Sequence, residues 1–170
     1  MSAKLRLLGF KELSRALEKL PRNMANNAAR AGVRAGAAVV RKAARNNLPS
    51  NYTTLRKSLI VKGRKKKHPN ITTASVGPTT GKGAKYDGFF AHMVEFGVKP
   101  HEIKPKNAKT LLFFSGGDPI FRGVVKKHPG VKQIPFMRNA LNNNKSAVLQ
   151  AMRIKLAEAI KKQAAKLGKK

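Results

Sequence analysis

The chain has 170 residues, 41% of them hydrophobic, and contains no cysteine. This length and composition predict one domain with a modest core, and they exclude disulfides and thiolate metal sites. No stretch approaches the roughly 18 consecutive apolar residues of a membrane-spanning helix, and the segment Met1–Phe10 lacks the apolar run and cleavage site of a secretory signal. The absence of cysteine fits a protein made in a reducing cytosol.

Charge is the most informative part of the composition. The chain carries 37 Lys and Arg against 7 Asp and Glu, a formal net charge of +30. Such a molecule repels its own copies and attracts polyanions, and solubility alone would require far less charge. We therefore expect a polyanionic partner, either a nucleic acid or a strongly acidic protein.

Two helices are predicted before residue 49. Phe10, Leu13, Leu17 and Leu20 recur at helical spacing, and Pro21 then forces a break, which predicts an N-terminal helix within residues 1–21. Residues 22–48 are rich in Ala and contain no strong turn signal, which predicts one long basic helix.

The long helix is expected to have two contrasting faces. Four arginines fall within roughly one sixth of its circumference: Arg30, Arg34, Arg41 and Arg45. The opposite face carries small residues: Ala25, Gly32, Gly36, Val39 and Ala43. Each glycine costs about 1 kcal/mol relative to Ala, which a close approach of another backbone would offset. The arginine stripe is either a surface that faces phosphates or acidic groups, or a solvated helix face.

Residues 55–134 are predicted to form a small antiparallel sheet and its loops. Leu55–Lys62 and Ile71–Val76 are typical of two strands joined by a loop. That loop carries four consecutive cations: Arg64, Lys65, Lys66 and Lys67. They either reach DNA phosphates or form a solvated tip. Leu111–Phe114 is expected to be a buried strand and Ile120–Lys127 a further one, giving about four short strands.

The segment Tyr86–Phe96 is predicted to contain a short helix that Gly97 ends, since a left-handed cap residue is inexpensive only for glycine. His92 and Glu95 would share a face of this helix. A metal site would need a third ligand, for which His101, Glu102 and His128 qualify by residue type alone. Lone histidines near aromatic residues are usually core or hydrogen-bonded groups, so we expect no metal site and no catalytic pair.

The C-terminal part is predicted to be one helix over residues 135–168. Pro135 suits its first turn. Residues at three- and four-residue spacing predict its inner face: Leu149, Met152, Leu156, Ile160, Gln163 and Leu167. The expected fold is α+β, a single domain over residues 1–170. In it the sheet of about four strands packs with the long N-terminal helix pair and the long amphipathic C-terminal helix.

Several short motifs occur in a fixed order. They are Val94-Glu95-Phe96-Gly97, Pro100-His101-x-Ile103-x-Pro105-Lys106, His128-Pro129-Gly130-x-Lys132, and Pro135-Phe136-Met137-Arg138-x-Ala140. With the N-terminal Phe10, Leu13, Leu17, Leu20 and Pro21, they resemble the neck or tail-completion (head–tail joining) proteins of long-tailed, non-contractile, lambda-like bacteriophages, over roughly residues 8–160. Val98 and Asn139 depart from that pattern, where Thr and a second Pro are common, and these departures affect local turns.

The resemblance implies an α+β virion protein that is assembled in the bacterial host cytoplasm and located at the head–tail junction. Such subunits form oligomeric rings, commonly hexamers, around a channel that DNA crosses. The implied partners are further copies of the chain, the connector or stopper, the tail-terminator or tail-tube proteins, and genomic DNA in the channel. No membrane partner and no cofactor are expected.

A ring of such basic subunits would repel itself unless negative groups lay nearby. The candidate polyanion-facing residues are therefore Arg30, Arg34, Arg41, Arg45, Arg64, Lys65, Lys66 and Lys67. The candidate fold- or interface-organising residues are Glu95, Phe96, Gly97, Pro135, Phe136, Met137 and Arg138.

Two other classes of function explain less of the sequence. A stand-alone, sequence-nonspecific DNA-binding protein explains the charge equally well, but it does not explain the ordered motifs. An enzyme is not expected, because acidic residues are scarce and dispersed, cysteine is absent and no Ser/His/Asp grouping emerges.

Overall fold

A computed structural model describes residues 10–63, 71–106, 108–115 and 118–167. The chain divides into two compact units. Residues 1–89 and 136–170 form the first, here called the helical unit, and residues 90–135 form the second, here called the hairpin unit. Helices and small antiparallel sheets together confirm the α+β class.

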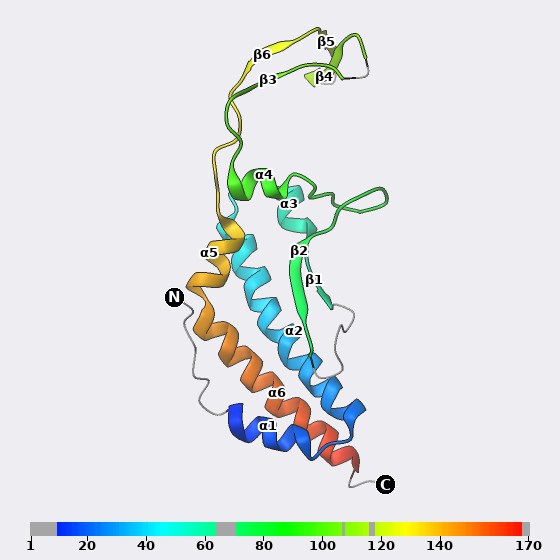
Figure 1. Cartoon of the computed structure of the whole chain (residues 1–170), viewed down its shortest axis with the longest axis vertical. Helices are drawn as coiled ribbons and strands as arrows, with labels where there is room; N and C mark the ends of the chain where they lie inside the picture. Colours follow the sequence, from blue (N-terminus) through cyan, green and yellow to red (C-terminus); the bar gives the residue numbers. More distant parts are fainter. Residues whose placement is uncertain (1–9, 64–70, 107, 116–117, 168–170) are drawn as a thin grey trace. The chain divides into compact units, whose positions relative to one another are not determined.

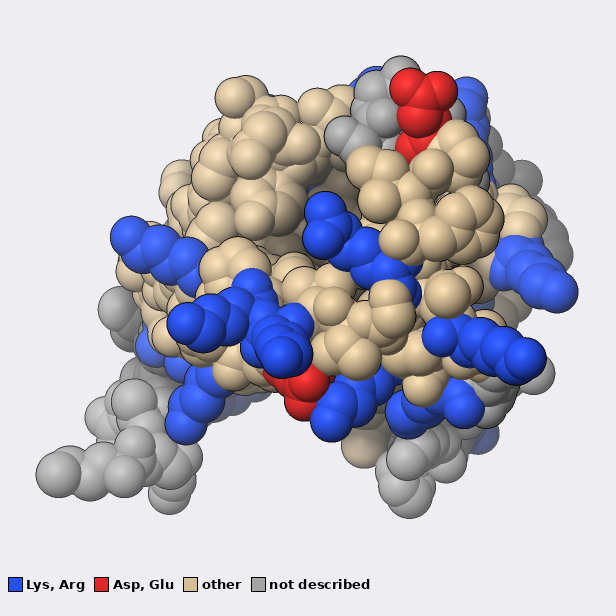
Figure 2. Space-filling view, turned by 90° about the horizontal axis from the view of Figure 1, so that it is seen from above, with Lys and Arg blue, Asp and Glu red and all other residues tan. Residues whose placement is uncertain are grey.

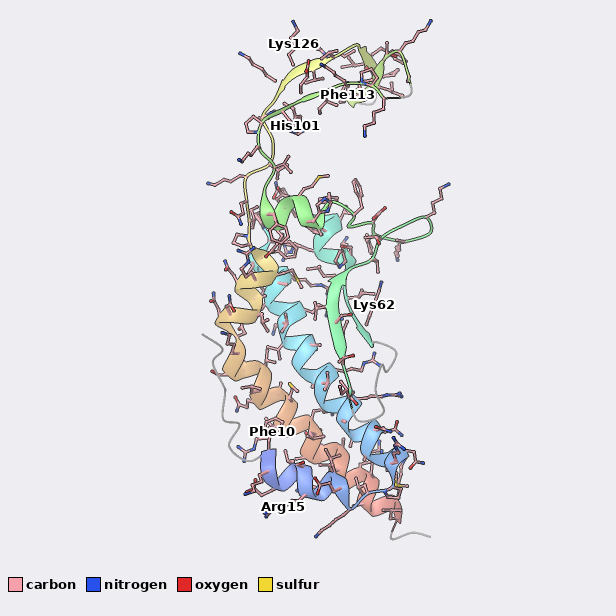
Figure 3. All side chains as sticks on the ribbon, in the orientation of Figure 1. Phe10, Arg15, Lys62, His101, Phe113 and Lys126 are labelled. Carbon is pink, nitrogen blue, oxygen red and sulfur yellow. The ribbon has the colours of Figure 1, made fainter. Side chains whose placement is uncertain are left out.

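Three helices of the helical unit pack against one another: α1 (Phe10–Glu18), α2 (Arg22–Asn47) and α6 (Lys145–Leu167) (Figure 1). Their shared core contains the buried Ala28, Leu156 and Ile160, and the apolar face of α1 covers it. Phe10 lies beside α6 in Figure 3, whereas Arg15 on the other face of α1 is exposed. The predicted N-terminal and long basic helices are both confirmed.

Close contact between α2 and α6 explains the small residues of α2. A Cβ atom on Gly32 would lie 3.1 Å from Leu156 Cβ and 3.3 Å from the Met152 carbonyl oxygen. The buried residues of α2 are Ala28, Gly32, Gly36, Val40 and Ala44. They form one row at four-residue spacing, the ridge that packs into a neighbouring helix. Ala25, Val39 and Ala43, predicted for this face, are only half-buried because they flank that row.

The C-terminal segment forms two helices where one was predicted. The first is α5 (Phe136–Asn143), directly after Pro135, and α6 follows it. Asn144 separates them: its side-chain amide donates to the Ala140 carbonyl at 2.9 Å, and its own carbonyl accepts the Val148 N–H at 2.9 Å. Asn favours such local bonds over a continuous helix, and three consecutive Asn residues end here.

The first predicted strand is a helix over half of its length. The helix α3 (Thr53–Ser58) precedes β1 (Leu59–Gly63), which pairs antiparallel with β2 (Ala74–Pro78). The reason is that Leu55, Ser58 and Leu59 are fully buried at helical three- and four-residue spacing. The second strand starts later than predicted, since Ile71 is 51% exposed and lies outside β2. The β1–β2 hairpin lies along α2 (Figure 1).

The hairpin unit contains α4 (Ala91–Phe96) and two antiparallel strand pairs. β3 (His101–Ile103) pairs with β6 (Val125–His128), and β4 (Leu111–Ser115) pairs with β5 (Asp118–Arg122). The described strands therefore form three two-stranded sheets, and the expected single sheet of about four strands is wrong in this respect.

Two further expectations for this unit are corrected. The predicted strand Ile120–Lys127 is divided at Gly123, because β5 and β6 pair with different partners. The segment Leu111–Phe114 is a strand but not a buried one: Leu112 is 50% exposed and Phe113 37% exposed. A two-stranded hairpin cannot bury both of its faces without a second layer.

Gly97 ends α4 as predicted, with a φ of +73°. A Cβ atom there would also lie 3.1 Å from the Val131 carbonyl oxygen and from the Gln133 backbone nitrogen. Backbone atoms cannot move aside as the end of a side chain can, so this position combines conformational and steric restriction.

We expect Gly97→Ala to lower the free energy of unfolding by about 1–3 kcal/mol, the typical cost of a non-glycine residue in this conformation. Urea denaturation followed by circular dichroism measures the change. Gly123→Ala is the matched control in the same unit, because a Cβ there meets nothing within 4 Å. Equal losses in the two variants would show that the restriction at Gly97 is unimportant.

Candidate functional site

The helical unit contains a cavity of about 920 Å³ beside the C-terminal half of α2. Its lining residues come from α2, α3 and the loop that follows β2: Ala38, Val39, Arg41, Lys42, Arg45, Asn46, Thr53, Arg56, Lys57 and Tyr86. Five of these residues are Arg or Lys, and none is Asp or Glu. We call this cavity the cationic pocket. Its volume falls in the range of pockets that bind small ligands or peptide side chains, about 300–1,000 Å³.

Helix α2 supplies one wall of the cationic pocket through ordinary helical spacing. Arg41 and Arg45 are four residues apart, as are Ala38 and Lys42, so both pairs lie on neighbouring turns of one face. The opposite, four-spaced row of small residues is held against α6. Packing with α6 therefore fixes the direction in which the cationic wall of α2 points.

Helix α3 supplies the facing cations. Leu55 and Ser58 are completely buried, and the Ser58 hydroxyl donates to the Leu55 carbonyl at 2.8 Å. Because these two residues face inward, Arg56 and Lys57 between them are directed outward, where both line the pocket. The Arg56 N–H donates to the Tyr52 carbonyl at 2.9 Å and so secures the first turn of α3.

Thr79 fixes the loop that carries Tyr86. Its N–H donates to the Ser58 carbonyl at 2.9 Å, and its hydroxyl donates to the Tyr86 carbonyl at 2.7 Å. The Tyr86 ring lies 5.4 Å from Lys57 Nζ and 5.8 Å from Lys85 Nζ, within the range of cation–π attraction. The ring thus holds ammonium groups at the edge of the pocket.

Arg45 is the most restrained cation of the pocket. Its Nη2 donates to the Leu59 carbonyl at 2.7 Å, which ties α2 to the start of β1. Its Nε is buried and has no hydrogen-bond acceptor among the described residues. Burial lowers the pKa of the Arg45 guanidinium below its ordinary value, and the charges of Arg41 and Arg56 lower it further.

The sign of this shift has a consequence for stability. A lowered pKa means that the folded protein holds charged Arg45 less favourably than the unfolded chain does. Arginine remains protonated at neutral pH, so the penalty is present there and would disappear only above the lowered pKa. A negative group placed among Arg41, Arg45 and Arg56 would offset it.

The predicted arginine stripe is divided by the structure. Arg41 and Arg45 line the pocket, whereas Arg30 and Arg34 lie nearer the N-terminal end of α2 and are exposed outside it. Arg64, Lys65, Lys66 and Lys67 lie outside the described residues. Sequence reasoning missed four contributors: Lys42, Arg56, Lys57 and Tyr86. The helical spacing of Leu55, Ser58 and Leu59 was the available signal that Arg56 and Lys57 face outward.

The residues predicted to organise the fold or an interface lie in both units. In the hairpin unit, Glu95 is buried in α4, Phe96 is 64% exposed, Gly97 ends the helix and Pro135 is half-buried. In the helical unit, Phe136 is fully buried at the start of α5, Met137 is half-buried and Arg138 is exposed. The Phe136 carbonyl accepts the Asn47 side-chain amide at 3.0 Å. A role in an interface stays a prediction for all seven.

His101 and His128 lie opposite each other on β3 and β6, with ring centroids 4.9 Å apart. Figure 3 shows His101 on this strand pair. The His128 Nδ1 accepts the Gly130 N–H at 3.2 Å, and the His101 Nδ1 lies 2.9 Å from the Lys99 carbonyl oxygen. Within the described parts of the chain, no three His, Asp or Glu side chains gather closely enough to hold a metal ion.

Among the charged side chains on the face that Figure 2 shows, blue Lys and Arg are far more abundant than red Asp and Glu. Of the helices that the structure describes, none has an apolar stretch of the length needed to cross a membrane.

Comparison with known proteins identifies the family. The sequence model of the family described as "Bacteriophage HK97-gp10, putative tail-component" matches residues 11–97, just over half of the chain. No curated protein and no solved structure matches significantly. The matched segment contains every residue that lines the cationic pocket. This family match also confirms the resemblance to phage neck and tail-completion proteins. The chain belongs to the HK97-gp10-like family of bacteriophage tail components.

Proposed function

We propose that this tail component is a structural subunit of the phage head–tail junction. Copies of it form an oligomeric ring that helps to join the tail to the DNA-filled head, and its basic surfaces face DNA or acidic neighbours. Membership of the phage tail-component family carries the proposal. The role is structural, so it needs no catalytic residue and no cofactor.

The net charge of the chain supports a position beside DNA or acidic proteins. Each subunit brings a formal charge of +30, and several such subunits in one ring would repel one another strongly. Genome phosphates or acidic protein faces would neutralise this charge and hold the ring in place. The connector or stopper and the tail-terminator or tail-tube proteins are the partners that a junction would provide.

Exposed apolar side chains in the hairpin unit support contacts with other subunits. Leu112, Phe113, Ile120 and Phe121 on β4 and β5 are all at least 37% exposed, and Phe121 is 66% exposed. Figure 3 shows Phe113 on this hairpin. The strand register pairs Leu112 with Phe121 and Phe113 with Ile120, so each face of this hairpin carries one exposed apolar pair that a neighbouring subunit could cover.

An assembly experiment tests the proposal. We expect a phage that carries a nonsense codon in this gene to accumulate DNA-filled heads and separate tails, visible by negative-stain electron microscopy. Adding the purified chain to such a lysate is expected to restore joined particles and plaques. Joined, infectious particles in the absence of the protein would overturn the junction role.

A stand-alone DNA-binding protein is the second candidate, and the net charge is the observation that favours it. It predicts tight binding of the isolated chain to duplex DNA, with an affinity that falls steeply as salt rises. A gel-shift titration at several salt concentrations measures this. Strong, salt-sensitive DNA binding together with normal head–tail joining in the nonsense mutant would favour this candidate.

A further inference from the structure

We infer that the cationic pocket binds an acidic, partly apolar peptide segment of a neighbouring virion protein, an assignment that rests on the proposed junction role for the source of the peptide. The pocket is built from α2, α3 and the loop that carries Tyr86, all within the helical unit.

The first argument is the unbalanced charge of the pocket. Arg41, Lys42, Arg45, Arg56 and Lys57 line one cavity, and no acidic side chain of the described residues lines it. Like charges gathered in this way repel one another. Burial is the main cause of the lowered pKa of Arg45, and the charges of Arg41 and Arg56 add to it. A carboxylate in the cavity would interact with several guanidinium groups at once and would remove that repulsion.

The second argument is hydrogen-bonding capacity. Guanidinium groups present planar, paired donors that match carboxylate oxygens. One donor of Arg45 is already used on the Leu59 carbonyl, which orients the guanidinium group. Arg41 and Arg56 line the same pocket, and their charges act on Arg45. The arrangement therefore offers a carboxylate several guanidinium groups, one of them held in a fixed orientation.

The lining of the pocket favours a peptide over duplex DNA. Duplex phosphates would use only its cations, whereas the lining also includes apolar groups. The Tyr86 ring already has two ammonium groups within cation–π distance, so it is not a free platform for stacking a base. Ala38 and Val39 provide an apolar part of the wall, where an aliphatic side chain beside the carboxylate would pack.

A second copy of the chain is a poor occupant. The whole chain has only 7 acidic residues, and each copy would bring a net charge of +30 to the contact. Of those acids, Glu158 is paired with Lys155 at 2.8 Å and Glu102 with Lys104 at 2.9 Å. A different, acidic protein is therefore the better match in charge.

Fluorescence anisotropy on the purified full-length chain tests the assignment. The probe is a short labelled peptide that alternates Glu and Leu, and the matched probe has Gln in place of Glu. At about 0.15 M salt, where long-range attraction is screened, we expect the Glu probe to bind at least about tenfold more tightly than the Gln probe.

Two charge-matched double variants separate the pocket from general charge. Arg41→Glu with Arg56→Glu changes the pocket, whereas Arg30→Glu with Arg34→Glu makes the same change in charge on exposed residues of α2. We expect the first pair to weaken binding of the Glu probe by about 10- to 100-fold, and the second by less than about threefold. Circular dichroism checks folding. If the first pair does not fold, Lys42→Glu with Lys57→Glu replaces it, since both lysines line the pocket and are exposed.

Three results would overturn the assignment. Equal losses in the two double variants would mean that diffuse charge binds the probe. Displacement of the probe by millimolar inorganic phosphate would identify a small oxyanion site. Duplex DNA that competes with the probe and loses affinity only in the pocket variant would identify a phosphate-backbone site.

The peptide assay and the assembly assay can fail independently. The anisotropy measurement uses the isolated chain, so a negative result there leaves the junction role standing. Unaltered head–tail joining in the nonsense mutant would remove the junction role while leaving the measured affinity of the pocket intact.

Discussion

Replacing Phe136 with alanine is expected to lower the free energy of unfolding by about 3–5 kcal/mol, the usual cost of truncating a buried phenylalanine. The side chain is only 1% exposed, and it is the largest fully buried side chain of the described residues. Natural domains are stable by about 5–15 kcal/mol, so this single change would remove a large fraction of the total. Because the Phe136 carbonyl still accepts the Asn47 amide in the variant, the experiment isolates the contribution of the ring.

Phe121→Ala is the matched control, since it removes the same atoms from a ring that is 66% exposed. We expect its free energy of unfolding to stay within about 0.5 kcal/mol of the parent. Urea denaturation followed by far-UV circular dichroism measures both variants. Similar losses in the two would mean that burial of Phe136 does not anchor the start of α5, and that its place in the Pro-Phe-Met-Arg motif has another cause.

The long helices could be predicted because each has a continuous apolar face. In α1, and around Leu156 and Ile160 of α6, apolar residues recur every three or four positions, and in α2 small residues do the same, so the pattern predicts both the helix and its buried side. Leu167, predicted for the inner face of α6, is 39% exposed. The buried row of α2 was predicted only in part. The prediction took the side opposite the arginine stripe, whereas the position of α6 decides which residues are buried. That position depends on contacts between residues more than 100 apart, such as Gly32 with Leu156.

The short elements could not be predicted in the same way. Helix α3 has six residues, less than two turns, so its periodicity is hardly distinguishable from that of a strand. The break at Asn144 depends on side-chain bonds to Ala140 rather than on hydrophobic pattern. In the hairpin unit, the alternation of apolar and polar residues predicted strands but not their partners. Strand pairing depends on residues far apart in the sequence, which this local pattern does not identify.

For the same reasons, the wall of the cationic pocket that α2 supplies could be predicted, and the wall that α3 supplies could not. Arg41 and Arg45 share a helical face by arithmetic, and the structure places both in the cavity. Arg30 and Arg34 share that face but lie outside, since the lining contributed by α2 begins only at Ala38. The cations on the facing wall, Arg56 and Lys57, belong to α3, which we predicted as part of a strand.

Replacing Gly32 with leucine is expected to lower the free energy of unfolding by about 3 kcal/mol, near the upper end of the usual cost of overpacking. The first added atom alone would lie 3.1 Å from Leu156 Cβ and 3.3 Å from the Met152 carbonyl, which is backbone and cannot rotate away. The remaining atoms would force α2 and α6 apart. Leucine is a better helix former than glycine by somewhat less than about 1 kcal/mol, so the measured loss would understate the steric cost.

Arg34→Leu is the control, because it places the same side chain on an exposed position of the same helix. Leu and Arg have nearly equal helix propensity, so we expect its free energy of unfolding to change by less than about 0.5 kcal/mol. Thermal and urea denaturation measure the free energy of unfolding of both variants. If Gly32→Leu is as stable as the parent, α2 and α6 do not approach each other as closely as the structure shows. The orientation of Arg41 and Arg45, which follows from that packing, would then lose its physical basis.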